Sequence, residues 1–438
     1  NAVSATISPA GKAARDAMPD YKVAKDVVRV LTPERNLHGE TPAQSVIDND
    51  GTLQLDEAAI KARAATNDYS FNNTLINATT VQAGGNLGQG VIVAVIDSGT
   101  ANWSGVPTLS GTVIGGQNFS GDGVSATSRS NGPHGTWVGT MIAGHAAFLI
   151  SKTSCLGASL AYNAPTSIQD GAPNYPTSYI LPVIGVAPGA SIYALKVFPY
   201  NTGSTASSRI MAAMDRAITM KKNFLAGQPP VPVSGSGTET DPFVYDSLNI
   251  QVVNMSLGGE TMIAGRDVED QLVQQMVAAG ITVAVSSGNA GPSGLTSGSP
   301  STSFASISSA AASTPTHERI LRDYQYCSPG FGKLYRPSDA IQTAYFSSRG
   351  PTADGRVGIG VTTAGDNNFA QGANGGLYFV SGTSFSAPTV AGAAALVRNA
   401  VPSASAAQVR NAIVLAANHK VLGDDSTVFD QGAGYLDV

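Results

Sequence analysis

The chain has 438 residues, a net charge of −5 and only 13% charged residues. Its lysines and arginines form no run suited to phosphates, which argues against a nucleic-acid partner. No apolar stretch approaches the ~20 residues that a membrane-spanning helix requires, so we expect no membrane span. The length allows two or three domains, or one large α/β domain with insertions.

The first part of the chain differs from the rest in its pattern of polar and apolar residues. Residues 1–75 are polar and mixed, apart from one basic and apolar stretch at 21–30. From residue 90 onward, buried apolar patterns take over. We therefore interpret 1–75 as an N-terminal extension and 76–438 as the main domain.

Four apolar, β-branched runs predict strands that are buried on both faces of a parallel sheet. Helical patterns separate these runs and close the chain. The strands are expected at 91–96, 192–197, 250–255 and 281–285, and the helices at 134–147, 204–220, 268–279, 384–398 and 405–417. Strands that alternate with helices indicate right-handed crossovers. The predicted fold class is α/β, with a doubly wound, mainly parallel sheet flanked by helices.

Three stretches look inserted into this pattern, at 146–184, 225–246 and 312–343. Long loops on an α/β scaffold often shape a binding site, and solvated surface decoration is an equal alternative. The first and third stretches each hold a cysteine, Cys155 and Cys327. A disulfide and two unpaired thiols both stay open, because sequence supplies no Cα distance.

Three short motifs carry the chemistry: Val-Ile-Asp97-Ser-Gly, His134-Gly-Thr and Gly-Thr-Ser384-Phe-Ser-Ala-Pro. A serine hydroxyl becomes a nucleophile when an imidazole takes its proton and a carboxylate fixes the imidazole tautomer. Asp97 ends a predicted strand, where open α/β sheets place their active sites. His134 and Ser384 begin predicted helices, whose N-termini favour developing negative charge.

The order Asp, His, Ser resembles that of the subtilisin-like serine peptidases. Further matching stretches extend the resemblance over about residues 77–438, while it does not reach residues 1–70. It implies a subtilisin-like fold and hydrolysis of peptide bonds in protein or peptide substrates. Ser384 would attack the carbonyl, His134 would move the proton, and Asp97 would orient the imidazole. Trp137 stands where family members often carry a second histidine.

The resemblance also assigns groups that contact the substrate. Asn289 would donate to the oxyanion together with the backbone N–H of Ser384. An extended peptide would pair with one segment through main-chain hydrogen bonds, and another segment would line the S1 pocket of the enzyme. These substrate-binding residues are Ser256, Leu257, Gly258, Gly259, Ser287, Gly288 and Gly298. No carboxylate is visible in these segments, so we expect large apolar or aromatic P1 side chains.

Metal binding is less defined. The chemistry requires no cofactor, and structural calcium is possible without a located site. Residues 48–57 keep the third, fifth, sixth and twelfth positions of an EF-hand loop, but Val46 stands where the first ligand belongs. A polar turn before a short helix explains this stretch equally well.

The remaining histidines have no motif around them. We expect His145 to be a packed residue on the same helix as His134. His38, His317 and His419 are expected at the surface.

Other functions remain open. The same acyl-enzyme could serve a peptide ligase or macrocyclase, and the fold could persist as a non-catalytic binding module. A lipase-type hydrolase is disfavoured, because the serine motif lacks the second glycine of Gly-x-Ser-x-Gly. The extension 1–75 is alternatively the remnant of an inhibitory propeptide. Few lysines and many Gly, Ser and Thr suit a secreted, extracellular or periplasmic protein; the oligomeric state is not predicted.

Overall fold

The computed structural model describes most of the chain, and the segments left out are residues 1–7, 10–11, 14–25, 32–45, 67–70 and 201. Its centre is an eight-stranded sheet with the order β16-β15-β14-β13-β4-β9-β5, in which β17 also pairs with β15. The four predicted strands are neighbours in its middle. They are β4 (Ile92–Asp97), β9 (Ser191–Lys196), β13 (Ile250–Met255) and β14 (Thr282–Ser286).

These four strands run parallel, as expected from their apolar texture. Parallel pairing continues outward to β5 (Val113–Asn118), β15 (Ile307–Ser313) and β17 (Val361–Ala364). Only the edge strand β16 (Gln342–Thr343) is antiparallel within this sheet. The predicted doubly wound, mainly parallel α/β fold is confirmed.

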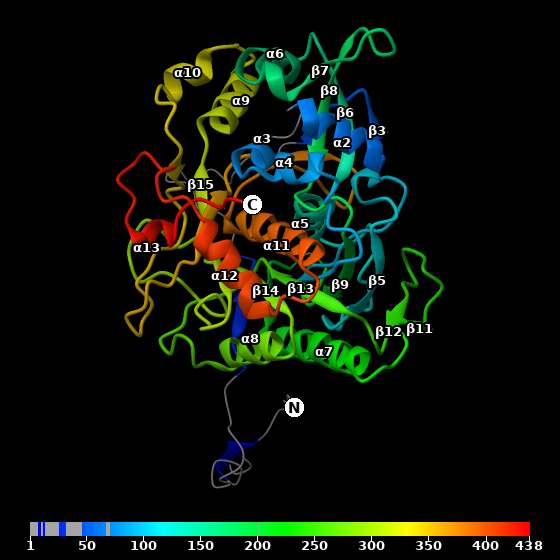
Figure 1. Cartoon of the computed structure of the whole chain (residues 1–438), viewed down its shortest axis with the longest axis vertical. Helices are drawn as coiled ribbons and strands as arrows, with labels where there is room; N and C mark the ends of the chain where they lie inside the picture. Colours follow the sequence, from blue (N-terminus) through cyan, green and yellow to red (C-terminus); the bar gives the residue numbers. More distant parts are fainter. Residues whose placement is uncertain (1–7, 10–11, 14–25, 32–45, 67–70, 201) are drawn as a thin grey trace.

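Helices cover both faces of the sheet (Figure 1). Successive residues of a strand point to opposite faces. Val93 and Val95 accordingly pack in one core with α5 (His134–Ala143), α11 (Thr383–Ala400) and α12 (Ala406–Ala416). Ala94 and Ile96 pack in a second core with α7 (Ser207–Leu225) and α8 (Val268–Ala278).

Helix α11 is buried nearly all round, which requires small side chains on its surface. Its sequence meets this need with alanines and with Gly392. A Cβ at Gly392 would lie 2.6 Å from the Cβ of Val186, so only glycine lets the two segments approach this closely. The helix thereby crosses under the centre of the sheet and brings its first turn to the ends of the middle strands.

Two predicted helices differ in their limits. The first ends at Ala143 rather than 147, and Gly144 leaves the helical conformation with ψ 142°. His145 then begins strand β6 (His145–Ser151), so its assignment to the helix of His134 is wrong. The second begins at Ser207, because residues 204–206 form strand β10 (Ser204–Ala206) instead.

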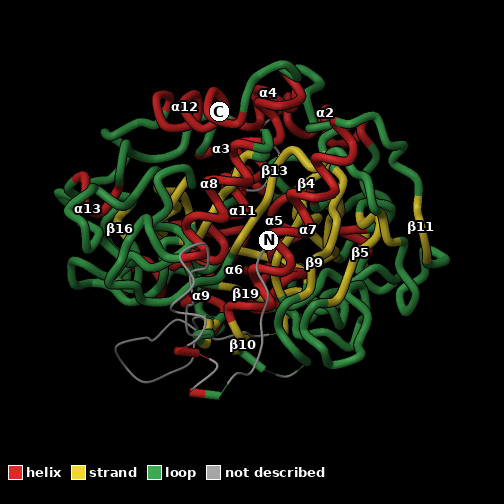
Figure 2. The backbone as a smooth tube through the Cα atoms, turned by 90° about the horizontal axis from the view of Figure 1, so that it is seen from below, coloured by secondary structure: helices red, strands yellow, loops and turns green. Residues whose placement is uncertain are grey.

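The inserted stretches have regular structure of their own. The first contributes β6, α6 (Cys155–Asn163), β7 (Gln169–Asp170) and β8 (Ser178–Ile184). The second forms a hairpin of β11 (Pro232–Ser234) and β12 (Val244–Tyr245), which lies at one edge of the molecule in both Figure 1 and Figure 2. The third contains α9 (Pro315–Tyr326), α10 (Phe331–Tyr335) and β16.

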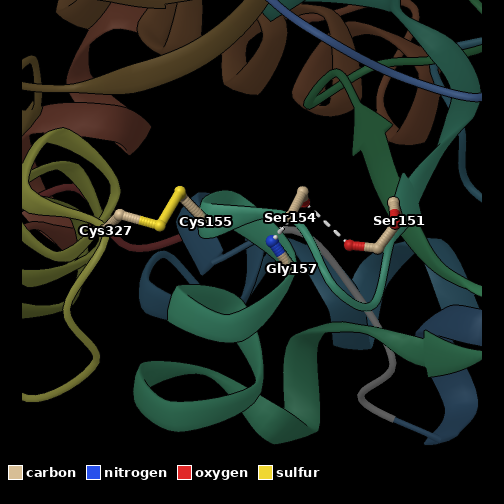
Figure 3. The surroundings of a disulfide bond; sticks show 5 residues. All are labelled: Ser151, Ser154, Cys155, Gly157 and Cys327. Atoms are coloured by element: carbon tan, nitrogen blue, oxygen red, sulfur yellow. Dashed lines mark hydrogen bonds between the residues drawn. A yellow bond between two sulfur atoms is a disulfide. The ribbon is translucent and has the colours of Figure 1, made fainter.

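A disulfide joins Cys155 to Cys327, with their Cα atoms 4.7 Å apart (Figure 3). Cys155 begins α6, whose N-terminus is capped by Ser154: its hydroxyl accepts from the N–H of Gly157 at 3.0 Å. Cys327 follows α9 directly. The disulfide therefore links the first insertion to the third. The sequence had left open whether these two cysteines are paired or are free thiols.

Described parts of the N-terminal extension pair with the main domain. β1 (Val28–Val30) lies beside β10, and β2 (Val46–Ile47) beside β19 (Leu377–Val380), which also pairs with β18 (Asn368–Gln371). β3 (Gly51–Gln54) joins β6, and α2 (Glu57–Thr66) contacts α4 (Ala78–Ala83). Among the described helices, none has both the length and the apolarity to cross a bilayer.

Candidate active site

Asp97 and His134 meet at the carboxyl end of β4. Nδ1 of His134 lies 2.8 Å from Oδ1 and 3.0 Å from Oδ2 of Asp97, whose side chain is fully buried. Gly135 permits this contact, because a Cβ there would lie 2.3 Å from the carbonyl oxygen of Gly99. The buried carboxylate holds the ring with its proton on Nδ1, which leaves Nε2 as the basic nitrogen.

Ser384 is the second residue of α11 and lies two positions after Gly382, whose φ of 142° suits glycine. Its hydroxyl donates to the carbonyl of Ser256 at 3.3 Å, and the hydroxyl of Ser256 donates back to the carbonyl of Ser384 at 2.7 Å. The ring of Phe385, the next residue, lies 5.6 Å from the ring of His134, centroid to centroid. The first turn of α11 therefore lies beside the imidazole.

Asn289 lies three residues beyond the end of β14 and is oriented by Thr383, the residue before Ser384. Its Oδ1 accepts from the backbone N–H of Thr383 at 2.9 Å and from the Thr383 hydroxyl at 2.8 Å. These two bonds fix the orientation of the amide, with Oδ1 on Thr383 and Nδ2 toward Gly382. Nδ2 lies 3.1 Å from the position of a Cβ on Gly382, so the amide donor is directed at the start of the helix.

The predicted substrate-binding segments adjoin each other. Gly259 pairs with Ser299 in an antiparallel bridge, with N–O distances of 3.0 and 2.9 Å. A Cβ on Gly298 would lie 2.3 Å from the carbonyl oxygen of Gly259, and one on Gly258 would lie 2.8 Å from that of Ser299. Glycine at these positions lets the two chains run against each other, while Leu257 is buried beside them.

The third predicted segment lies next to α11. The N–H of Gly288 donates to the Thr383 hydroxyl at 3.2 Å, and Gly288 has a φ of 109°. The N–H of Ser287 donates to the carbonyl of Ser309 on β15 at 3.0 Å. All the predicted site residues thus lie just past the carboxyl ends of β4, β13 and β14, or on the elements that meet them there.

Trp137 packs behind the imidazole. Its ring lies edge-on to those of Tyr378 and Phe385, with centroids 5.2 and 6.2 Å away, and 6.4 Å from that of His134. The side chain is buried. Trp137 therefore helps to pack the helix that carries His134.

Two other histidines differ from expectation. His317 is fully buried in the first turn of α9, where Nδ1 lies 2.8 Å from the Thr314 hydroxyl, so its surface assignment is wrong. Burial lowers the pKa of His317 to about 4. His145 is half-buried on β6, and its Nε2 lies 3.3 Å from Nε2 of Gln54. His419 is exposed as expected, and His38 lies outside the described residues.

In the loop that resembles an EF-hand, side-chain oxygens accept hydrogen bonds from other groups of the protein. Oδ1 of Asn49 accepts from the N–H of Gly51 at 3.2 Å, and Oδ2 of Asp50 accepts from the Ser178 hydroxyl at 2.9 Å. Glu57 begins α2. Within the part of the chain that the structure covers, no group of three or more His, Cys, Asp or Glu side chains is placed to hold a metal ion.

Two features near the site were not predicted from the sequence. Thr383 orients Asn289. The position of Thr383 next to Ser384 in the serine motif could have indicated a role at the site. Arg29 and Glu269 form a buried ion pair beside Gly259, with Nη2 and Oε2 2.7 Å apart. These two residues are 240 positions apart, and no local pattern links them.

Comparison with known proteins identifies the class. A sequence model described as the subtilase family matches residues 88–434. Subtilisin DY of Bacillus licheniformis is 28% identical over 368 residues, which cover 83% of this chain and 95% of that protein. Subtilisin E of Bacillus subtilis (strain 168) is 31% identical over 259 residues, covering 58% of this chain and only half of that protein.

Two solved structures share the fold. S41 psychrophilic protease has a TM-score of 0.54 at 20% identity, and Sphericase one of 0.53 at 21%. Each match covers 80% of this chain and 92% of the other chain. The chain belongs to the subtilase family of serine peptidases, which confirms the predicted family and fold.

Proposed function

We propose that this chain is a serine endopeptidase that cleaves peptide bonds through an acyl-enzyme, with Asp97, His134 and Ser384 as its catalytic residues. The observation that carries the proposal is the contact of 2.8 Å between Nδ1 of His134 and the buried carboxylate of Asp97. It leaves Nε2 to act as the base, next to the helix turn that bears Ser384.

The chemical steps follow from this arrangement. Nε2 of His134 takes the proton of Ser384 as Oγ forms a bond to the substrate carbonyl carbon. The imidazolium then gives that proton to the amine, which leaves as the carbon–nitrogen bond breaks. A water molecule attacks the ester by the same route and releases the acid. Oγ donates to the carbonyl of Ser256 in the free protein, and a hydrogen bond to Nε2 of His134 would replace that contact when substrate binds.

The oxyanion that forms on attack needs donors aimed at it. The amide Nδ2 of Asn289 and the backbone N–H of Ser384 supply them at the N-terminus of α11, where the helix dipole favours negative charge. Thr383 supports this role, because its two hydrogen bonds hold the amide with Nδ2 toward the helix start.

The substrate is proposed to be an extended protein or peptide segment that pairs with residues 256–259. The S1 pocket, with Gly298 at its floor and Ser287 and Gly288 nearby, would take large apolar or aromatic side chains. No cofactor is required for these steps, and any calcium would be structural. A secreted, extracellular or periplasmic location fits the disulfide between Cys155 and Cys327.

Digestion of a peptide library, with cut sites mapped by mass spectrometry, tests the proposal. The full chain should hydrolyse internal bonds, with large apolar residues enriched at P1, and the Ser384→Ala variant should not. Products joined end to end instead of hydrolysed would indicate a ligase. A library left intact by folded wild-type protein would overturn the endopeptidase proposal.

A further inference from the structure

A peptide strand from the N-terminal extension lies next to the proposed substrate-binding segment. β1 pairs antiparallel with β10 in the register Val28 to Ala206 and Val30 to Ser204. Backbone hydrogen bonds of 2.7 Å extend the pairing at both ends, from Ser207 N–H to Val27 and from Leu31 N–H to Gly203. The side chain of Val28 is 70% exposed, so apolar burial of this side chain does not hold the strand in place.

The side chain of Arg29 anchors this strand. Arg29 is only 6% exposed; its Nε donates to Oε2 of Glu269 at 2.8 Å, and its Nη2 lies 2.7 Å from the same oxygen. Nη1 donates to the carbonyl of Glu260 at 3.3 Å, and Nη2 lies 3.5 Å from Oδ2 of Asp267. The guanidinium thus fills an acidic pocket that consists of Glu269, Asp267 and the Glu260 carbonyl.

The acidic pocket adjoins the proposed substrate-binding segment. A Cβ on Gly259 would lie 2.8 Å from Nη1 and 3.1 Å from Cδ of Arg29, so the absence of a side chain at Gly259 makes room for the guanidinium. Ser256, at the other end of the segment, contacts Ser384. Three residues of extended chain span roughly 10 Å, which places the acidic pocket about three residues from the reacting serine.

The chemistry of the acidic pocket demands a cation. Glu269 is buried, and removing a carboxylate from water is costly unless a cation and hydrogen bonds compensate. Its pKa is raised to about 7, chiefly by burial, although Arg29 opposes the rise. Asp267 uses its other oxygen to cap α8 and to accept from the Ser299 hydroxyl at 2.7 Å, which fixes the wall of the pocket.

We propose that the acidic pocket of Glu269, Asp267 and the Glu260 carbonyl is a substrate subsite selective for arginine, which Arg29 occupies in the free protein. This rests on the proposed peptidase function and adds a specificity determinant to it. The subsite lies about three residues from the bond that is cut. A substrate strand with arginine there takes the place of β1 along β10 and Gly259.

Arginine suits this subsite better than lysine. Its planar fork directs separate N–H groups to the Glu269 carboxylate, to Asp267 and to the Glu260 carbonyl, as Arg29 does. A lysine ammonium is a single compact centre and cannot reach all three together. Selectivity should therefore be for the guanidinium and not for positive charge alone.

Binding measurements test the subsite without requiring catalysis. Fluorescent peptides with arginine, lysine or alanine at successive positions are titrated into the full chain carrying Ser384→Ala with Arg29→Ala. We expect arginine at one position to tighten binding at least tenfold over alanine, and over lysine by a smaller factor. Adding Glu269→Gln should abolish this preference. Lys152→Ala removes an exposed ion pair with Asp170 and serves as the control, which should leave binding unchanged.

The outcomes separate the two proposals. Equal binding of arginine and alanine peptides at every position overturns the subsite, whether or not the wild-type protein cleaves peptides. A clear arginine preference in a protein that cleaves nothing supports the subsite and overturns the peptidase. If Arg29→Ala does not fold, Arg29→Lys keeps a cation in the acidic pocket; arginine peptides should displace β1 from that variant more readily than from the parent carrying Arg29.

Discussion

Asp97 and His134 join the end of a central strand to the start of a helix, with Oδ1 and Nδ1 2.8 Å apart. The carboxylate also accepts from the N–H of Ser98 at 2.6 Å. Its two oxygens are thereby held in place before any substrate arrives. Catalysis that relies on this carboxylate should depend on its charge and on its acceptor character, and not merely on its volume.

The Asp97→Asn variant tests this dependence. The asparagine amide can donate to Nδ1, which favours the tautomer with the proton on Nε2 and leaves no base for Ser384. We expect kcat to fall by about 10⁴ with KM little changed, as for the equivalent change in other serine peptidases. Steady-state kinetics with a chromogenic peptide measure this. A loss of less than tenfold in folded protein would argue against the assignment, and the surface change Asp170→Asn provides the control.

Asn289 should act on the transition state more than on substrate binding. Replacing it by alanine removes the donor directed at the start of α11, and we expect kcat to fall by about 10²–10³. KM should change little. Thr383→Val leaves Asn289 in place but removes one of the hydrogen bonds that orient it, so its loss should be smaller. A rise in KM without a fall in kcat would show that Asn289 binds substrate instead.

The disulfide between Cys155 and Cys327 should stabilise the fold without affecting the chemistry. It closes a separation of 172 residues, for which loop entropy in the unfolded chain predicts about 5 kcal/mol. The double variant Cys155→Ser, Cys327→Ser should lower the free energy of unfolding by about 3–5 kcal/mol and keep kcat. Denaturant unfolding measures the loss; a reductant should lower the stability of the wild type only. An unchanged midpoint in the variant would contradict the prediction.

His317 should make the protein sensitive to acid. Its pKa of about 4 in the fold lies below the ordinary value of 6.5, so between these values the unfolded chain binds a proton that the folded chain does not. Stability from this residue is therefore complete above about pH 6.5 and lost as the pH falls toward 4, by at most about 3 kcal/mol. Burial of Glu269 and Asp270 raises their pKa values to about 7 and 6, which acts in the opposite direction.

A comparison of variants isolates the histidine from these other groups. Unfolding free energies of the wild type and His317→Gln are measured at pH 4.5 and pH 7. The variant is expected to lose less stability on acidification than the wild type. Equal losses would show that His317 does not titrate as its burial implies.

The strands and helices that carry the site could be predicted because the signals are local. Buried parallel strands form continuous apolar runs, as at 91–96, and the alanine-rich pattern after Ser384 is that of a packed helix. The end of the helix of His134 was missed, because the run beyond Gly144 is apolar in either conformation. This run forms strand β6 because it pairs with β8 and β3, and those partners are not its neighbours in the sequence.

Other features could not be predicted, because they too depend on contacts between residues far apart in the sequence. His317 stands among charged residues that suggest a surface helix, yet its side chain faces the interior. Arg29 looks like an ordinary basic residue until the fold brings Glu269 to it from 240 positions away. The disulfide likewise joins two insertions whose proximity depends on the whole sheet.

The most direct test of the account is covalent labelling of the folded full chain with a fluorophosphonate, which reacts with activated serine hydroxyls. We expect one adduct, located on Ser384 by peptide mass spectrometry, with labelling strongly reduced in His134→Ala and absent in Ser384→Ala. A folded wild-type protein that forms no adduct, or forms one on a different serine, would contradict the proposed catalytic residues.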